Sequence, residues 1–365
     1  MFSGNAAAVV GMVWLAGSAA AQSVPLPAAP AGVETFRSNG IEFARVRATG
    51  VPAILPFGRN LGGHDLDFAI SRTEVTQGQW FEFINATSGL AVPQGQPYTQ
   101  GLSHILAGGR SVGPGVRGVG LNDQGRFIWT TTEVGANIPV ANAGWYAHAL
   151  YSNWMHNGQT ASLDAINNGV YDLRGWDVTR ADSWINSPRQ PGARFWIPSF
   201  DEWQTASYFD PNRFGAGQAG WWPYHYGRER LPIPGAPGEG ETSFRWSPAD
   251  PTFFPTTLPV AAYPGSQSPW GLLDTSGTFT EQLEDIRPSS DPGFPEYDRL
   301  TAGTMAGLIG PPEFETPMEQ LGFYGAGSAN QDFVSFRLAT AIPSPGAGFI
   351  VGLLLVMRSG SRRKR

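Results

Sequence analysis

Residues 68–85 read FAISRTEVTQGQWFEFIN, in which an extended segment runs directly into a helical one. The first part, residues 68–75, predicts a strand or the edge of a strand. Thr76 then stands where a helix N-cap is expected, because its hydroxyl accepts hydrogen bonds from free backbone N–H groups. The helix is predicted over residues 77–85, with Trp80 on its apolar face.

Three further elements follow from local patterns. Residues 41–46 (IEFARV) alternate apolar and polar side chains, as a half-buried strand does. A second helix is predicted over residues 145–156. Ser199 and Glu202 have the spacing of a capping box, in which each side chain bonds the other's backbone N–H, ahead of a helix over residues 200–208.

The composition favours a loop-rich globular domain. The chain has 365 residues with 47 glycines and 31 prolines, and both residue types disrupt the interiors of helices. It is 41% hydrophobic and contains 13 tryptophans, enough apolar side chain to bury a substantial core. Such a chain is expected to fold into irregular loops around a compact centre.

Charge and cysteine content exclude several classes of function. The net charge is −6, and Lys364 is the only lysine, so the basic stripe that nucleic-acid binding requires is missing. There is no cysteine. Disulfides, thiolate nucleophiles and thiolate metal sites are therefore excluded together.

The two ends of the chain predict export. Residues 1–21 carry an apolar run followed by Ala-Ala-Ala, the pattern of a secretory signal peptide, and residues 22–40 are a predicted linker. Residues 342–365 combine a Pro-Ser-Pro motif, an apolar run shorter than the ~20 residues that span a bilayer, and an Arg-rich tail. This order resembles PEP-CTERM sorting signals of bacterial envelope proteins. We expect an exported protein of the cell envelope or extracellular space, anchored in the membrane through this segment before processing.

Five segments resemble the sulfatase-modifying factor family, which has the fold of the formylglycine-generating enzyme. In chain order they are ISRTEVTQGQWFEFIN (70–85), PVANAGWY (139–146) with NW (153–154), RFWIPSFDEW (194–203), PV (259–260) with GLLDTSGTFTE (271–281), and FRLAT (336–340). The resemblance covers residues 41–341. It implies one α+β domain, loop-rich and of the C-type-lectin-like type.

Residues 274–281 are the candidate metal site. Calcium prefers oxygen ligands, which a short loop supplies from carboxylates and backbone carbonyls. The matching positions of the family form a structural calcium site, which implies the carboxylates of Asp274 and Glu281 and the backbone oxygens of Gly277 and Phe279 as ligands. The alternative interpretation is that both acids are exposed in a loop.

The resemblance also implies a reaction for which this chain lacks the groups. Formylglycine generation in the family uses a copper-binding cysteine pair in the segment that precedes FRLAT. The matching stretch, residues 299–336, contains no cysteine. We therefore predict no catalytic residue, no cofactor-binding residue and no formylglycine-generating activity.

Two other groups of residues are candidate sites. His148 and His156 are two helical turns apart, about 12 Å, which is too far for both rings to bind one metal. The five histidines are therefore predicted to be surface groups or satisfied hydrogen-bonding groups. The aromatic loop, residues 221–246, is predicted either to bind a glycan or peptide or to pack on the core in place of helices.

Two functions remain open from the sequence. The first is an exported, non-catalytic domain that acts as a binding or structural module at the cell envelope, with an envelope protein or a glycan as its partner. The second is a divergent metal-dependent oxidoreductase of the same fold that uses ligands other than cysteine. Several histidines or carboxylates converging in a pocket would favour the second.

Overall fold

The computed structural model describes residues 25–47, 67–88, 90, 117–121, 127–141, 143–175, 187–246, 258–288, 297–303, 324–326 and 334–342. The predicted signal peptide and nearly all of the predicted sorting segment lie outside these residues. Within the described ranges, no helix has the length and apolar character that crossing a membrane requires.

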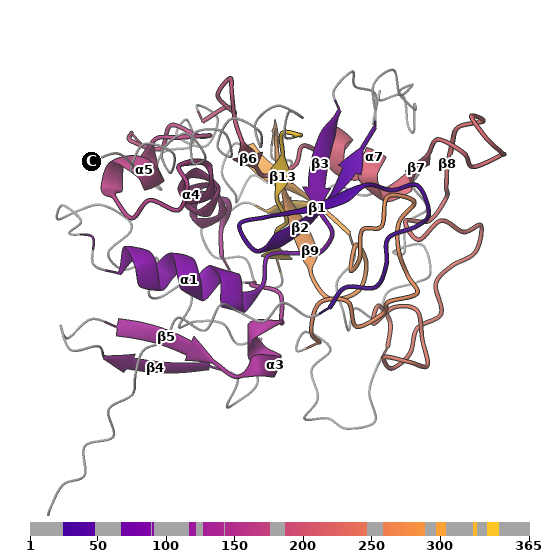
Figure 1. Cartoon of the computed structure of the whole chain (residues 1–365), viewed down its shortest axis with the longest axis horizontal. Helices are drawn as coiled ribbons and strands as arrows, with labels where there is room; N and C mark the ends of the chain where they lie inside the picture. Colours follow the sequence, from indigo (N-terminus) through magenta and orange to yellow (C-terminus); the bar gives the residue numbers. More distant parts are fainter. Residues whose placement is uncertain are drawn as a thin grey trace, which may run out of the picture.

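A five-stranded antiparallel sheet joins distant parts of the chain (Figure 1). Its strands, in spatial order, are β1 (Thr35–Ser38), β2 (Ile41–Val46), β3 (Phe68–Ser71), β13 (Ala339–Thr340) and β6 (Phe195–Trp196). Ala339 lies opposite Ile70 on one side and Trp196 on the other. β2 has the predicted bounds, whereas β3 ends before the predicted residue 75, because the hydroxyl of Ser71 donates to the carbonyl of Thr73 in a turn.

A second sheet and two hairpins complete the strands. The sheet has the order β11 (Tyr324–Ala326), β10 (Tyr297–Ala302), β9 (Thr280–Pro288) and β12 (Val334–Ser335). The hairpins pair β4 (Arg117–Leu121) with β5 (Phe127–Thr131), and β7 (Phe209–Asp210) with β8 (Gly220–Trp221). β12 runs parallel to β9, with Ser335 opposite Glu281. This register brings the FRLAT segment beside the candidate metal site.

Five helices lie in the described part of the chain. They are α1 (Gln77–Thr87), α3 (Glu133–Ala136), α4 (Trp145–His156), α5 (Leu163–Asn167) and α7 (Phe200–Tyr208). α4 and α7 have the predicted bounds, and α1 runs two residues past the predicted end. In α7 the hydroxyl of Ser199 accepts from the backbone N–H of Glu202 at 3.1 Å, and the Glu202 carboxylate accepts from that of Ser199 at 2.8 Å. This confirms the capping box.

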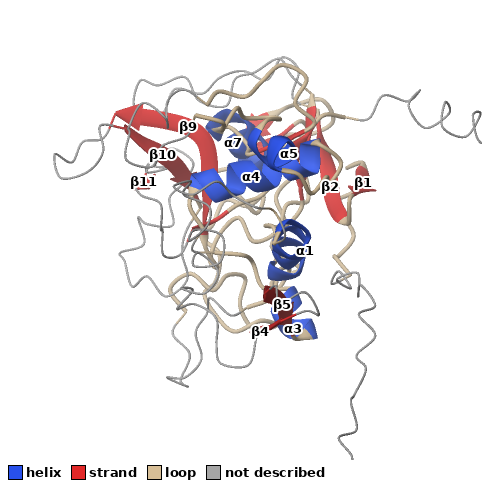
Figure 2. Cartoon of the chain, turned by 90° about the vertical axis from the view of Figure 1, so that its left-hand side faces the viewer, coloured by secondary structure: helices blue, strands red, loops and turns tan. Residues whose placement is uncertain are grey.

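The core lies where the helices meet the two sheets. Figure 2 shows β9 and β10 on one side of α4 and β1 and β2 on the other. Phe336, just after β12, packs edge-on against Trp80 of α1, with ring centroids 5.9 Å apart, and against Tyr151 of α4 at 5.6 Å. The N–H of Leu273 bonds the carbonyl of Arg72 at 2.7 Å. The segments that carry the family resemblance therefore share one core.

Part of the predicted linker belongs to the domain. Thr35–Ser38 forms β1, which pairs with β2 across the turn at Asn39 and Gly40. The backbone at both turn residues is left-handed, with φ of 49° and 79°, as a two-residue hairpin turn requires. Upstream, the guanidinium of Arg72 donates to the carbonyl of Pro27 at 2.8 Å. The chain is thus tied to the core from Pro27 onward.

Candidate functional site

A buried ion pair links the beginning of β9 to the FRLAT segment. Arg337 and Glu281 are both fully buried, and Nη2 of Arg337 lies 2.6 Å from Oε1 of Glu281. Nε of Arg337 donates to the other carboxylate oxygen, which also accepts from the indole N–H of Trp203 at 3.1 Å. The remaining donors of Arg337 reach the carbonyls of Ser71, at 2.9 Å, and Leu273, at 3.0 Å. The guanidinium thereby joins three segments.

Glu74 adds a second buried carboxylate to this centre. It is fully buried, and its Oε1 accepts a hydrogen bond from the hydroxyl of Ser335, whereas its Oε2 has no hydrogen-bond partner. Burial, reinforced by the nearby negative charges of Glu281 and Asp274, raises the pKa of Glu74 well above its usual range. The carboxyl of Glu74 therefore favours its protonated form.

Asp274 is the third acid. It is 8% exposed, and its Oδ2 accepts from the backbone N–H of Ala261 at 2.6 Å. Burial raises the pKa of Asp274 to about 6, and no ion pair to it is present among the described residues. The acid–arginine cluster, which we define as Glu74, Asp274, Glu281 and Arg337, thus has three carboxyl groups for one guanidinium.

The turn between the two predicted carboxylate ligands requires glycine at one position. Gly277 has φ of 112°, and a Cβ there would lie 2.8 Å from the hydroxyl oxygens of both Ser243 and Thr242. Phe279, which follows, is buried. The close approach places Thr242 and Ser243 against the turn. Asp274 and Glu281 are both buried, so the alternative of two exposed loop acids is wrong.

These residues fit a calcium ion only in part. Asp274 has no cationic partner, which favours a bound cation, but both oxygens of Glu281 already bond Arg337. Calcium ligation by Glu281 would have to share or displace those bonds. In the part of the chain that the structure describes, no group of three or more His, Asp or Glu side chains is placed to hold a metal ion.

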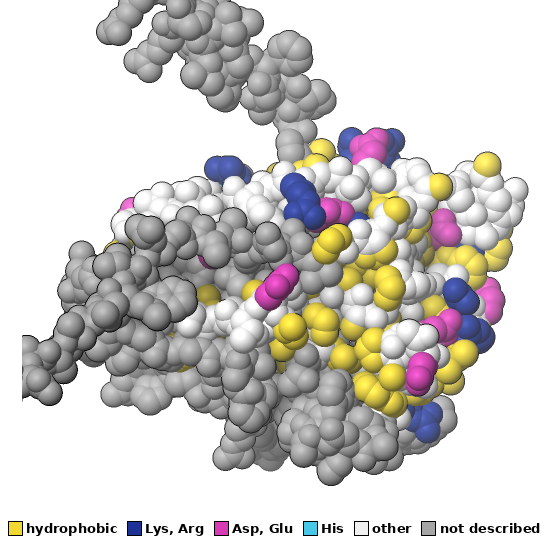
Figure 3. Space-filling view, turned by 60° about the horizontal axis from the view of Figure 1, so that its bottom comes forward, with side chains coloured by type: hydrophobic (Ala, Val, Ile, Leu, Met, Phe, Trp, Pro, Cys, Tyr) yellow, Lys and Arg dark blue, Asp and Glu magenta, His cyan; other side chains and the backbone are white. Residues whose placement is uncertain are grey.

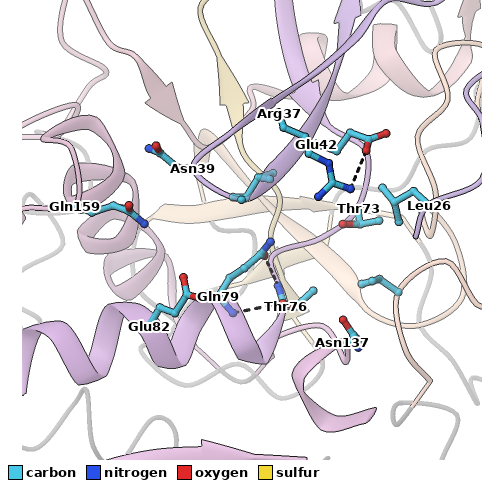
Figure 4. Close-up of a pocket in the computed structure, with 13 residues that line it drawn as sticks. Leu26, Arg37, Asn39, Glu42, Thr73, Thr76, Gln79, Glu82, Asn137 and Gln159 are labelled. Carbon is cyan, nitrogen blue, oxygen red and sulfur yellow. Dashed lines mark hydrogen bonds and ion pairs between the residues drawn. The ribbon is translucent and has the colours of Figure 1, made fainter. Parts of the chain in front are cut away.

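A polar cavity of about 350 Å³ lies between the β1–β2 turn, the beginning of α1 and the residues after α4 (Figure 4). Its lining includes four carboxamide side chains and two threonine hydroxyls: Asn39, Gln79, Asn137, Gln159, Thr73 and Thr76. In Figure 4, Asn39 and Gln159 lie near each other at one side, and Thr73 and Leu26 at the other. The cavity is separate from the acid–arginine cluster, with which it shares no lining residue.

Ion pairs fix the wall of this cavity. Glu42 of β2 accepts from Arg37 at 3.1 Å and from the buried Arg72 at 2.6 Å. Arg72 also donates to the carbonyl of Gly271 at 2.9 Å. The hairpin that carries Asn39 is thereby held against the core.

Comparison with known proteins identifies the domain. The sequence profile of the sulfatase-modifying factor enzyme 1-like domain matches residues 64–342, which is more than half of the chain. The chain belongs to this family. The α+β, loop-rich single-domain fold expected from the sequence is thereby confirmed.

Other comparisons add less to this assignment. Among solved structures, the chain is similar to variable protein 1 of Treponema denticola, at 16% identity and a TM-score of 0.45, covering 85% of this chain and 99% of that one. No curated protein sequence matches. The assignment to the sulfatase-modifying factor family therefore rests on the profile match.

This member of the family has no cysteine anywhere in its sequence. A copper-binding thiolate pair is therefore absent, and methionine sulfur cannot act as a thiolate nucleophile. Met305 and Met318, in the matching segment, lie outside the described residues.

The described histidines do not form a metal site. His148 is fully buried and stacks on Phe336 with ring centroids 4.0 Å apart. Neither of its ring nitrogens has a hydrogen-bond partner among the described residues. Burial lowers the pKa of His148 to about 3, so the ring is neutral. His156 accepts from the N–H of Arg194 at 3.0 Å, and His225 is buried against Tyr208. The prediction of a satisfied histidine was wrong for His148, while His64 and His104 lie outside the described residues.

The aromatic loop packs largely on the core. Trp221 is buried against Phe209, with ring centroids 5.2 Å apart, and Tyr226 is buried as well. The half-buried Trp222 donates its indole N–H to Asp210 at 3.0 Å.

Figure 3 shows hydrophobic side chains gathered on the described part of one face, with few, scattered basic ones. Phe214, 63% exposed, is among the few large apolar side chains left open.

Sequence reasoning missed Glu74, Arg337 and the whole polar cavity. Glu74 and Arg337 stood inside quoted family motifs, but nothing in their local pattern shows that they meet. One signal for the cavity was available, since Asn39-Gly40 between alternating residues is a strong hairpin signature. Residues 22–40 were instead predicted as a linker.

Proposed function

We propose that this protein is an exported, non-catalytic member of the sulfatase-modifying factor family that acts as a binding or structural module at the cell envelope. The observation that carries the proposal is the absence of any thiol from a chain with this family's fold. Without a thiolate pair, the chain lacks the copper ligands that the family uses to oxidise a substrate cysteine.

The acid–arginine cluster supports a structural role for the family motifs. Its central pair, Arg337 and Glu281, is fully buried, and its hydrogen bonds join separate segments of the chain. A catalytic acid or base has to reach a substrate atom within hydrogen-bond distance. The motifs retained here thus serve to close the fold.

A calcium ion bound at Asp274 forms part of the proposal. With Glu74 protonated, the two carboxylates of Asp274 and Glu281 face the one guanidinium of Arg337, which leaves a local excess of negative charge that a divalent cation would offset. Among the described residues neither Asp274 nor Glu74 has an ion pair, and Asp274, with a pKa of about 6, is the one of the two that is charged at pH 7. When bound, calcium would supply charge neutralisation only.

Metal analysis of the purified protein tests this function. After dialysis against buffer without chelator, we expect calcium in near-stoichiometric amount and neither copper nor iron, and we expect the Asp274→Asn variant to lose the calcium. Tightly bound copper or iron would instead support the second function, a metal-dependent oxidoreductase with ligands other than cysteine. No described group of side chains favours that second function.

A further inference from the structure

We propose that the polar cavity beside the β1–β2 turn binds a neutral, polyhydroxylated ligand about the size of a disaccharide. The inference rests on the proposed binding role and gives that role a site and a class of ligand. The cavity's volume of about 350 Å³ is at the lower end of the range of ~300–1,000 Å³ that is usual for small-molecule sites.

The lining matches hydroxyl groups. A carboxamide carries both an acceptor oxygen and an NH2 donor, so it bonds groups that also donate and accept, as sugar hydroxyls do. Asn39 and Gln159 make no side-chain hydrogen bond within the described residues, and neither does the hydroxyl of Thr73. The amide oxygen of Gln79 accepts from the N–H of Thr76 at 2.9 Å. The NH2 group of Gln79 has no hydrogen-bond partner among the described residues. These groups form an unused set of donors and acceptors around one space.

The charges at the cavity favour a neutral ligand. Two cations, Arg37 and Arg72, and two anions, Glu42 and Glu82, lie in or against its wall, so their formal charges sum to zero. Glu42 is already paired with both arginines. Glu82, the other acid of the described lining, is exposed to solvent, so the described wall presents no excess of buried charge that a strongly charged ligand would offset.

The apolar part of the lining is too small for other ligand classes. Among the described lining residues it consists of Leu26, Ile41 and Val260, and none of those residues is aromatic. A nucleobase or an aromatic ligand would have no ring to stack on. A largely apolar ligand would bury carboxamides that it could not bond.

Two of the carboxamide residues have a left-handed backbone conformation. Asn39 and Gln159 have φ of 49° and 62°, the left-handed region, the first in the hairpin turn and the second just after α4. Both backbone positions are set by neighbouring regular structure, which fixes the points from which the two side chains project.

Glycine at these positions gives a clean test, because it removes the carboxamide and tolerates the left-handed backbone. The variants are Asn39→Gly and Gln159→Gly. Arg245→Gly is the matched control, since Arg245 also has a left-handed φ, of 58°, and does not line the cavity.

The probes are cellobiose, maltose, trehalose and N,N′-diacetylchitobiose, titrated to high millimolar concentration into the full, ¹⁵N-labelled protein. Side-chain amide resonances in NMR spectra report on Asn39 and Gln159 directly. We expect saturable shifts of these resonances with at least one disaccharide. Each cavity variant should weaken that binding about tenfold, as expected for the loss of one or two hydrogen bonds, and the control should bind as the wild type does.

Several results would overturn the inference. They are no shift with any of the four disaccharides, equal affinity in the wild type and both cavity variants, or shifts only with the peptide mimic N-acetylglycylglycinamide. The titration is independent of the metal analysis. Copper in a protein that still binds the sugar contradicts the proposed function alone, whereas a calcium-loaded protein that binds no sugar contradicts this inference alone.

Discussion

Arg337 and Glu281 form a fully buried, two-point ion pair, with Nη2 and Oε1 2.6 Å apart. Arg337 lies beyond the end of β12 and Glu281 near the beginning of β9, two strands that run parallel with Ser335 opposite Glu281. The same guanidinium bonds the carbonyls of Ser71 and Leu273. One side chain therefore ties the closing segment of the domain to both the first sheet and the turn that carries Asp274.

Removing one partner of this pair should be costly. Arg337→Met leaves the Glu281 carboxylate buried without a counter-charge, so we expect the free energy of unfolding to fall by about 3–5 kcal/mol. The double variant Arg337→Met, Glu281→Leu removes both charges and should recover a large part of that loss. Urea denaturation followed by tryptophan fluorescence measures all three proteins. Equal losses in the single and double variants would show that the pair is not the source of the effect.

Because of Asp274, the stability of the folded protein should depend on both pH and calcium. Its pKa of about 6 in the folded protein lies above the ordinary 3.8, so the folded state holds the extra proton and stability falls as pH rises from about 4 to 6. The loss is about 3 kcal/mol in chelator and should be absent from Asp274→Asn. Calcium should restore stability to the wild type at pH 7 and leave the variant unchanged. A wild-type protein indifferent to calcium at pH 7 would argue against the ion.

His148 should make the folded protein less stable as pH falls, which is the opposite of the pH dependence expected from Asp274. Its folded pKa of about 3 lies below the ordinary 6.5, so the unfolded state takes up the proton first, and stability is lost as pH falls from about 6.5 towards 3. This amounts to about 5 kcal/mol over the full window. His148→Phe keeps an aromatic ring against Phe336 and removes the proton-binding group. The unfolding free energy of the wild type, relative to that of the variant, should rise with pH and level off above about 6.5. A difference that does not vary with pH would refute the assignment.

Alanine variants of Gly277 and Gly158 distinguish the cost of a left-handed backbone from the cost of steric crowding by the added methyl group. Both have positive φ, 112° and 66°, but a Cβ at Gly277 would collide with Thr242 and Ser243, whereas one at Gly158 would meet nothing within 4 Å. Gly158→Ala should cost about 1 kcal/mol for the left-handed backbone alone. Gly277→Ala should cost clearly more, and thermal unfolding of the two variants compares them. A smaller loss for Gly277→Ala would mean that the turn relaxes.

The helices were predictable because their determinants are local. Ser199 and Glu202 cap α7 three residues apart, and the bounds of α4 and α7 follow from patterns within a dozen residues. The acid–arginine cluster was not predictable in this way. Asp274 and Glu281 were found through a family motif, but the partner that satisfies Glu281 is 56 residues away in the chain. Only the folded register of β9 and β12 brings it there.

The polar cavity was even less predictable from local sequence patterns. Asn39 and Gln159 come from segments that share no motif and no spacing, and the residue type of each is ordinary for a turn or a helix end. One wall of the cavity belongs to residues 22–40, for which the composition predicts a linker. The Asn39-Gly40 turn was the one local sign that this segment is structured.

We propose above all that this domain keeps the family's fold without its reaction. The most direct measurement is to incubate the copper-treated protein with a cysteine-containing sulfatase peptide and follow the peptide by mass spectrometry, with a catalytic member of the family as the positive control. We expect the peptide to keep its thiol while the control converts it to formylglycine. Formylglycine in the presence of this cysteine-free protein, above the level with copper alone, would contradict the account.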